Sequence, residues 1–171
     1  FSLASAVIAQ APNAVCTGAT PLTLGTPLSG EASNAGGALL ASCTAPGPSA
    51  LARYYSVTVP AQTLATLTAA AATLDPLLAV VDGCASTTCQ VTDSNSSVSE
   101  SVRLTNASAM PRTFLVAVVD KTGAGGTFII TSTSQALPPN STCATATTLA
   151  PGTPLTSQPI LGGGATSSVY S

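Results

Sequence analysis

The feature of this 171-residue sequence that most limits its fold is an internal repeat. With an offset of 127 positions, segment 1–29 aligns on segment 128–156 without a gap, and thirteen of the 29 aligned positions are identical. Chance similarity between stretches rich in Ala and Thr is the weaker explanation, because less common residue types match as well. A tandem repeat with a period of about 127 residues is therefore predicted. The matches include Phe1 with Phe128, Asn13 with Asn140, Cys16 with Cys143, Gly25 with Gly152 and Pro27 with Pro154.

The repeat divides the chain into one whole module and two partial ones. Residues 1–12 are interpreted as the last strand of a preceding module plus a linker, and residues 13–135 as a complete module. Residues 136–171 are interpreted as a linker and the start of the next module. The apolar run at 1–11 also resembles the end of a signal peptide, but its match to segment 128–138 favours a strand.

Strand patterns dominate the rest of the sequence. Residues 53–59 alternate in character until Pro60, and residues 98–104 show the same period of two. The uninterrupted apolar run 77–81 is typical of a strand buried on both faces. No segment has the period of an amphipathic helix. The pattern predicts an all-β fold, an antiparallel β-sandwich, with further strands at 63–70, 114–119 and 126–133.

The low charge of the chain limits its partners. Charged residues make up 6% of the sequence and the net charge is −2, whereas ordinary soluble domains have roughly 25% charged residues. No basic surface is available for nucleic acid, so no nucleic-acid partner is expected. The longest apolar runs have about ten residues, which is too short to span a bilayer, so membrane insertion is not expected. Such a surface suits a chain coated in glycan or covered in an assembly.

The side chains available for catalysis are few. The sequence contains no His, which removes the commonest general base and the commonest metal ligand. A Ser–Lys dyad would depend on Lys121 alone, and a solvated lysine beside a Gly-rich turn is the simpler interpretation. Asp75, Asp82, Asp93 and Asp120 could offer oxygen atoms to calcium, but they form no DxDxD pattern. The chain is therefore expected to be non-enzymatic and to hold no metal or other cofactor.

Five cysteines predict folding in an oxidising compartment. A Cys84–Cys89 disulfide would close a short loop, and the alternative of a redox-active pair lacks the CxxC spacing. Cys16–Cys43 is the second pair by elimination, although Cys143 could compete for either partner. Cys143 is otherwise expected to be unpaired or to have an external partner.

Glycans could be attached to the chain or contacted by it. Asn-x-Ser/Thr sequons begin at Asn95, Asn106 and Asn140, which are candidate glycosylation sites. Chance is the competing explanation, because Ser and Thr are abundant. Tyr54 and Tyr55 are neighbours on a predicted strand, so one of them should point into the core. A sugar-stacking platform, for which Tyr170 is a further candidate, is therefore the weaker interpretation.

Several short motifs also occur in a characteristic order. Asn13, Cys16 and Ala19 open the series, and the strand RYYSVTVP at 53–60 has Tyr54 where a tryptophan is usual. The segment LDPLLAVVDGCASTTC at 74–89 and the strands at 113–120 and 126–133 follow. Together they resemble the bacterial pre-peptidase C-terminal domain family over almost all of residues 13–135. The resemblance implies a jelly-roll-like sandwich that occurs as repeats in large secreted proteins.

The sequence departs from that family in two places. Acidic residues are usual after the second cysteine of the 74–89 motif, but only Asp93 occurs here. The partial module after residue 136 also lacks a counterpart of Cys43, which leaves the partner of Cys143 open.

These observations favour a structural repeat module of a secreted or cell-surface glycoprotein, such as a filament, an adhesin stalk or a wall. Bias toward Ala, Ser, Thr and Pro resembles algal extracellular glycoproteins, and a mastigoneme-like filament protein is the most specific hypothesis. The expected partners are neighbouring repeats or further copies of the same protein, together with glycans. The alternative, implied by the family, is an accessory carbohydrate- or substrate-binding domain, or a secretion-associated domain, of a secreted hydrolase.

Overall fold

The computed structural model describes residues 10–43, 51–92, 98–123, 125–138, 140, 146–154 and 156. In this part of the chain the regular elements are three short 3-10 turns and ten strands, which form two sheets. The turns are η1 (Pro12–Ala14), η2 (Cys16–Gly18) and η3 (Ser33–Ala35). The strands are β1 (Thr20–Leu22), β2 (Leu28–Ala32), β3 (Gly37–Ala38), β4 (Leu51–Val59), β5 (Thr63–Ala71), β6 (Pro76–Val81), β7 (Gln90–Thr92), β8 (Ser99–Asn106), β9 (Arg112–Asp120) and β10 (Thr127–Ala136).

The first sheet has the strand order β1-β4-β9-β6-β7. Its centre is the long β4–β9 pair, which runs antiparallel from Leu51 opposite Asp120 to Val59 opposite Arg112. Strand β3 pairs antiparallel with the beginning of β4, and β1 pairs with the same strand further along. The β1–β4 pair is parallel, so the first sheet is mixed rather than purely antiparallel as the sequence suggested.

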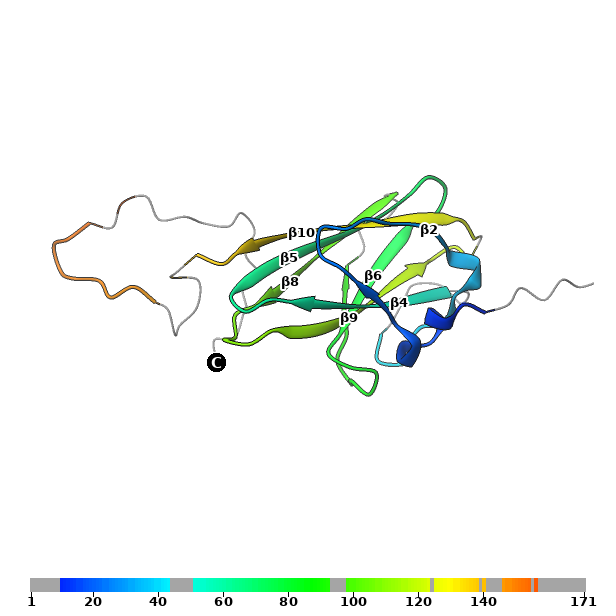
Figure 1. Cartoon of the computed structure of the whole chain (residues 1–171), viewed down its shortest axis with the longest axis horizontal. Helices are drawn as coiled ribbons and strands as arrows, with labels where there is room; N and C mark the ends of the chain where they lie inside the picture. The colour runs from blue at the N-terminus through cyan, green and yellow to red at the C-terminus, as the bar shows by residue number, and fades with distance from the viewer. Residues whose placement is uncertain are drawn as a thin grey trace, which may run out of the picture.

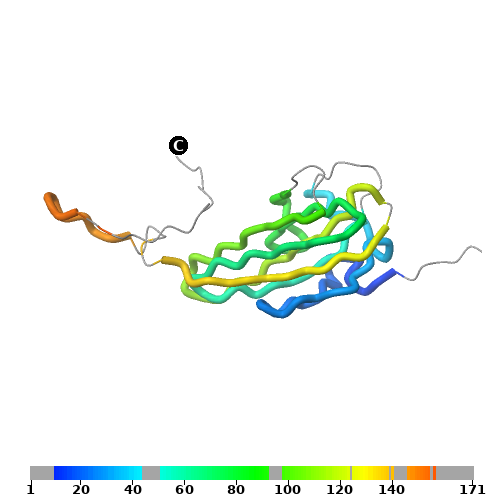
Figure 2. Tube along the Cα trace, turned by 90° about the horizontal axis from the view of Figure 1, so that it is seen from above, coloured from blue at the N-terminus to red at the C-terminus, as the bar shows by residue number. Residues whose placement is uncertain are grey.

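The second sheet has the order β2-β10-β5-β8 and is antiparallel throughout. It packs over the first sheet as the other layer of the sandwich (Figure 1). Viewed from above, β10 and β5 run side by side along the length of the sandwich (Figure 2). The prediction of an all-β sandwich is thus confirmed. The repeat period stays a prediction.

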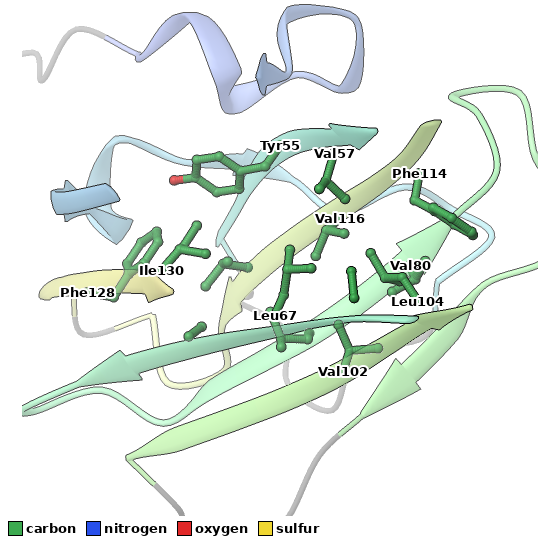
Figure 3. Packing of buried hydrophobic residues seen from close by; sticks show 14 of the residues in the cluster. Tyr55, Val57, Leu67, Val80, Val102, Leu104, Phe114, Val116, Phe128 and Ile130 are labelled. Atoms are coloured by element: carbon green, nitrogen blue, oxygen red, sulfur yellow. The ribbon is translucent and has the colours of Figure 1, made fainter. Parts of the chain in front are cut away.

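The main core fills the space between the sheets. Alternate residues of each strand point inward, which is the period of two read from the sequence. Tyr55 stands at one end of this core, where its ring meets Phe128 edge-on with ring centroids 6.3 Å apart. Figure 3 shows both sheets contributing, with Leu67 and Val102 facing Val116.

A second apolar layer covers the outer face of the first sheet. Tyr54, Leu77 and Val119 face outward from the first sheet, yet each is at most 1% exposed. Residues 16–19 and 39–43, on either side of β2, lie over them and close this layer. We call the chain from η1 to Cys43, without β2, the covering segment. All six residues of β6 are buried, which confirms the strand predicted to be buried on both faces.

Glycine allows this covering segment to lie close to itself. A Cβ atom added at Gly37 would be 2.2 Å from the backbone oxygen of Ala14, which is closer than any real contact. The η1 turn and β3 can therefore touch only because Gly37 has no side chain.

The chain enters and leaves the sandwich at opposite ends of its long axis. The η1 turn lies at the end where Figure 1 is coloured dark blue, whereas β10 runs toward the other end (Figures 1 and 2). The proposed strand at 1–7 lies outside the described residues. Of the proposed linker and start of the next module at 136–171, only residues 136–138, 140, 146–154 and 156 are described. The division at residues 12 and 135 therefore stays a prediction. No described helix is long and apolar enough to cross a membrane.

Candidate functional site

Two disulfides fasten the covering segment to the first sheet. Cys16 in η2 is bonded to Cys84, and Cys43 is bonded to Cys89. The four cysteines expected to form disulfides do so, but both expected pairings are wrong. The reason is tertiary: the loop after β6 extends over the outer face of the first sheet, where both ends of the covering segment reach it. Cys143 lies outside the described residues.

A buried polar network lies at the end of the main core near Tyr55. The Tyr55 hydroxyl donates a hydrogen bond of 2.7 Å to Glu31 Oε2, and Arg53 Nη2 donates one of 2.7 Å to the same oxygen. Arg53 Nη1 also donates to the backbone oxygen of Ala32. Burial, and then the adjacent Glu31 carboxylate, raise the pKa of Tyr55. The network joins β4 to the edge strand β2 and holds one positive and one negative charge.

Sequence reasoning missed this network, although a signal for it was present. Arg53, Tyr55 and Val57 are alternate residues of β4, so their side chains point to the same face of the strand. Tyr55 and Val57 face the core. An inward-facing arginine needs a buried acceptor. Glu31 is the acidic residue that β2 brings to it.

Asp120 organises the turn between β9 and β10. Its carboxylate is fully buried and accepts hydrogen bonds from the Ser33 hydroxyl and from backbone NH groups of Thr122, Gly123 and Gly125. The Thr122 hydroxyl donates a further bond of 2.8 Å. Burial opposes ionisation, but the hydrogen bonds outweigh it and lower the pKa of Asp120 below its usual value. These contacts identify Asp120 as a structural anion.

The other described aspartates that were considered as calcium ligands each pair with a basic side chain. Asp75 pairs with Lys121 at 3.0 Å, and Asp82 pairs with Arg112 at 2.6 Å. Asp93 lies outside the described residues. Among the described residues, no group of three or more His, Cys, Asp or Glu side chains could hold a metal ion.

Both tyrosines of β4 are buried, rather than only one. Tyr55 belongs to the main core, and Tyr54 belongs to the layer on the opposite face. The Tyr54 hydroxyl donates to the backbone oxygen of Ala38 at 3.0 Å. Neither ring is available to stack on a sugar, and Tyr170 lies outside the described residues.

Asn106 is 1% exposed and its amide is fully used. The Nδ2 atom donates to the backbone oxygens of Val59, Pro60 and Met110, and Oδ1 accepts from Ser108. A glycan on Nδ2 would break these bonds, so the expectation of a glycan on Asn106 is wrong for the folded domain. Asn140 is half-buried in the linker, and Asn95 lies outside the described residues; both stay candidates.

A groove with a volume of about 660 Å³ lies between the edge strands β7 and β8. Val80 and Phe114 from the core lie beneath it, and Gln90 and Arg103 belong to its polar walls. At one end, the Arg112 guanidinium lies 4.7 Å from the centre of the Phe114 ring while it pairs with Asp82. The groove combines apolar groups with neutral polar and charged side chains, which suits contact with a peptide or a glycan better than covalent chemistry.

Neither a search of protein-family models nor a search of curated proteins gave a match. Among solved structures, the chain is similar to the pre-peptidase C-terminal domain of a collagenase from Bacillus anthracis. The two share 12% sequence identity, the TM-score is 0.45, and the match covers 67% of this chain and 93% of that one. With a TM-score this low, the fold of this chain rests on its own strand pairings.

Proposed function

We propose that this domain is a non-enzymatic structural module of an extracellular repeat protein, in which successive sandwiches are joined end to end. The observation that carries the proposal is the path of the chain. It enters at the η1 end and leaves along β10 at the opposite end (Figure 1). A tandem array of such modules extends along the axis of the sandwich, because each linker starts where the previous sandwich stops.

Three further observations support this proposal. The 127-residue repeat places a second Pro-Asn-x-x-Cys motif directly after β10. The two disulfides indicate maturation in an oxidising compartment, as in secreted proteins. The low charge leaves hydration to hydroxyl and amide groups or to attached glycans, for which Asn95 and Asn140 are the remaining candidates. A filament, a stalk and a wall layer would all use these properties.

The test is the length of an array. Chains with one, two and three copies of residues 13–139 would be compared by small-angle X-ray scattering. The maximum dimension should rise by at least about 33 Å per copy, because the ten residues of β10 span that length. A variant with both Pro138 and Pro139 changed to Gly provides the matched control and should give shorter, more variable arrays. Side-by-side compaction of the copies, with no rise in length, would contradict the proposal.

The second candidate function is that of an accessory binding domain, and the groove between β7 and β8 favours it. Its volume of about 660 Å³ is typical of ligand sites. Titration of the labelled chain with soluble oligosaccharides and extended peptides, followed by NMR, tests this function. Saturable shifts at Gln90 and Arg103, absent when Arg103→Glu is titrated, would support it.

A further inference from the structure

The groove between β7 and β8 lies along the outer edge of the second sheet. Among the described strands, β8 pairs with β5 alone, so its other side faces the groove. The backbone NH of Ala71 donates to the carbonyl oxygen of Val98, and from this pair onward hydrogen-bonded and non-bonded pairs alternate along β5 and β8. The backbone NH and C=O groups of Ser101, Arg103 and Thr105 therefore point away from β5 and toward the groove.

The floor of the groove is the most exposed part of the main core. Val80 and Phe114 are 8% and 6% exposed, which is more than any other residue of that core. They gather with Leu104 of β8 at the same end of the core (Figure 3). A chain lying along β8 would thus place every second side chain on an apolar floor.

The dimensions of the groove fit a single extended strand. Sheets of a sandwich pack about 10 Å apart, and strands within a sheet lie about 4.8 Å apart with a rise of about 3.4 Å per residue. One residue of a packed strand therefore takes up roughly 160 Å³. The groove of about 660 Å³ holds about four such residues. This length is close to that of segment 101–105, the part of β8 that lines the groove.

The groups around the groove favour a peptide over a glycan. A peptide backbone presents alternating donors and acceptors at the spacing of the β8 edge, whereas the hydroxyl groups of a sugar have no such period. Sugars also stack on exposed aromatic rings, but both tyrosines of β4 are buried. The Arg112 guanidinium already covers the ring of Phe114.

Charge adds one preference to the peptide sequence. One aspartate and two arginines line the groove, which gives a net charge of +1, and Asp82 pairs with Arg112. Arg103 lies between Val102 and Leu104, which face the core, so its side chain is on the outer face of the sheet. In an added strand, a carboxylate opposite Arg103 would be stabilised by that guanidinium. The sequence that fits is therefore apolar, acidic, apolar.

We propose that an extended peptide with an apolar–acidic–apolar centre binds this groove as an added antiparallel strand of the second sheet, next to β8. Its backbone pairs with Ser101, Arg103 and Thr105, and its two apolar side chains cover Val80 and Phe114. This inference rests on the second candidate function, in which the groove is a binding site, and adds the class of ligand and the mode of contact. It does not depend on the end-to-end array.

The probe that tests the contact is the peptide acetyl-SGTVEVTGS-amide, titrated into the full isotope-labelled chain. Saturable NMR shifts are expected on β7 and β8. Methyl groups on the backbone nitrogens of its third, fifth and seventh residues remove the NH groups that donate to β8, and should weaken binding tenfold or more. The matched control peptide carries methyl groups on the nitrogens of its fourth and sixth residues, which point away from β8, and should keep the affinity of the parent peptide.

Changes in the chain test the same contact from the other side. Thr105→Pro removes an NH group that faces the groove and spares the hydrogen bonds to β5. It should bind the peptide at least tenfold more weakly than Thr105→Ala, which keeps that NH group. Arg103→Glu should weaken binding of this peptide and should favour the same peptide with lysine in place of glutamate. This reversal does not require the fold to tolerate a proline.

Four results would overturn the proposal. The peptide could fail to saturate the chain at millimolar concentration, the two methylated peptides could bind equally well, or a soluble oligosaccharide could bind the groove while the peptide does not. Shifts along β8 that grow with protein concentration alone would assign this edge to a second copy. Equal binding of the methylated peptides, or binding of the oligosaccharide, would leave the second candidate function intact. Only the absence of binding by peptides and oligosaccharides alike would remove that function as well.

Discussion

At the scale of single residues, the buried charges of this domain serve to join segments. Arg53, Glu31 and Tyr55 tie the first sheet to the edge strand β2, and Asp120 ties η3 to the turn after β9. Each of these groups is paired within the domain. The scarcity of charge in the sequence thus has a counterpart in the structure, because several of the few charged side chains hold the sandwich together.

Replacing the Asp120 carboxylate should cost stability. Asp120→Asn changes two oxygens that accept five hydrogen bonds into one oxygen and one donor, and should lower the free energy of unfolding by about 1–3 kcal/mol. Urea unfolding near neutral pH measures this loss. Asp82→Asn, at an exposed ion pair, is the control and should cost less than about 1 kcal/mol.

Asp120 should also make the stability of the folded domain depend on pH. The folded pKa of Asp120 lies below the ordinary value of 3.8, so the unfolded chain binds the proton more readily. The stability that Asp120 contributes is therefore present above pH 3.8 and is lost as the pH falls below that value through the folded pKa. The loss of stability across this acid range should be smaller in Asp120→Asn than in the unchanged chain. An equal slope in both would contradict this assignment.

At the scale of elements, the long strands were predictable and the short ones were not. The apolar run at 77–81 and the alternation at 53–59 are local patterns, and they correspond to β6 and β4. Strands β1 and β3 have three and two residues. Such short strands have no period of their own and form only because the covering segment lies against the edge of β4.

The pairing of the cysteines could not be predicted for the same reason. Proximity in sequence suggested Cys84 with Cys89, but the covering segment crosses the sheet and reaches both from outside.

The burial of Asn106 could not be predicted from the sequence either. A sequon is a pattern of only three residues. The carbonyl oxygens that accept hydrogen bonds from the Asn106 amide come from the end of β4 and from the turn before β9. Contacts between distant segments decide both outcomes.

Cysteine variants should separate the observed pairing from the expected one. Under the observed pairing, Cys16→Ser with Cys84→Ser removes one disulfide and should cost about 4 kcal/mol, as expected for a loop of 68 residues. Cys84→Ser with Cys89→Ser removes both disulfides and should cost clearly more. The expected pairing would reverse this order, because the second variant would then lose only a short loop. Urea unfolding and a non-reducing peptide map measure the difference.

At the scale of the whole molecule, the sandwich is elongated, and the described chain enters it at one end and leaves it at the other (Figure 1). Strands β5 and β10 run along its length and pair over nine residues (Figure 2). Tension on an array would pull along the strands rather than across them, so many hydrogen bonds between β5 and β10 would have to shear together. Such a shearing arrangement resists extension better than an arrangement in which the force breaks the hydrogen bonds between two strands one pair at a time.

The Cys16–Cys84 disulfide would carry such a pulling force directly from the start of the domain to the loop after β6, a route that we call the shortcut. Force entering near η1 passes through that bond to the loop after β6, so the chain from β1 to β6 carries none of it. Only the residues from Cys84 to the end of β10 can then be drawn out, and their extended contour length is about 18 nm, against about 43 nm for the whole domain after reduction. Single-molecule extension with and without reductant measures both lengths, and equal lengths would contradict the shortcut. In an array, the Cys16–Cys84 disulfide would limit the length to which each module can be extended when it unfolds under force.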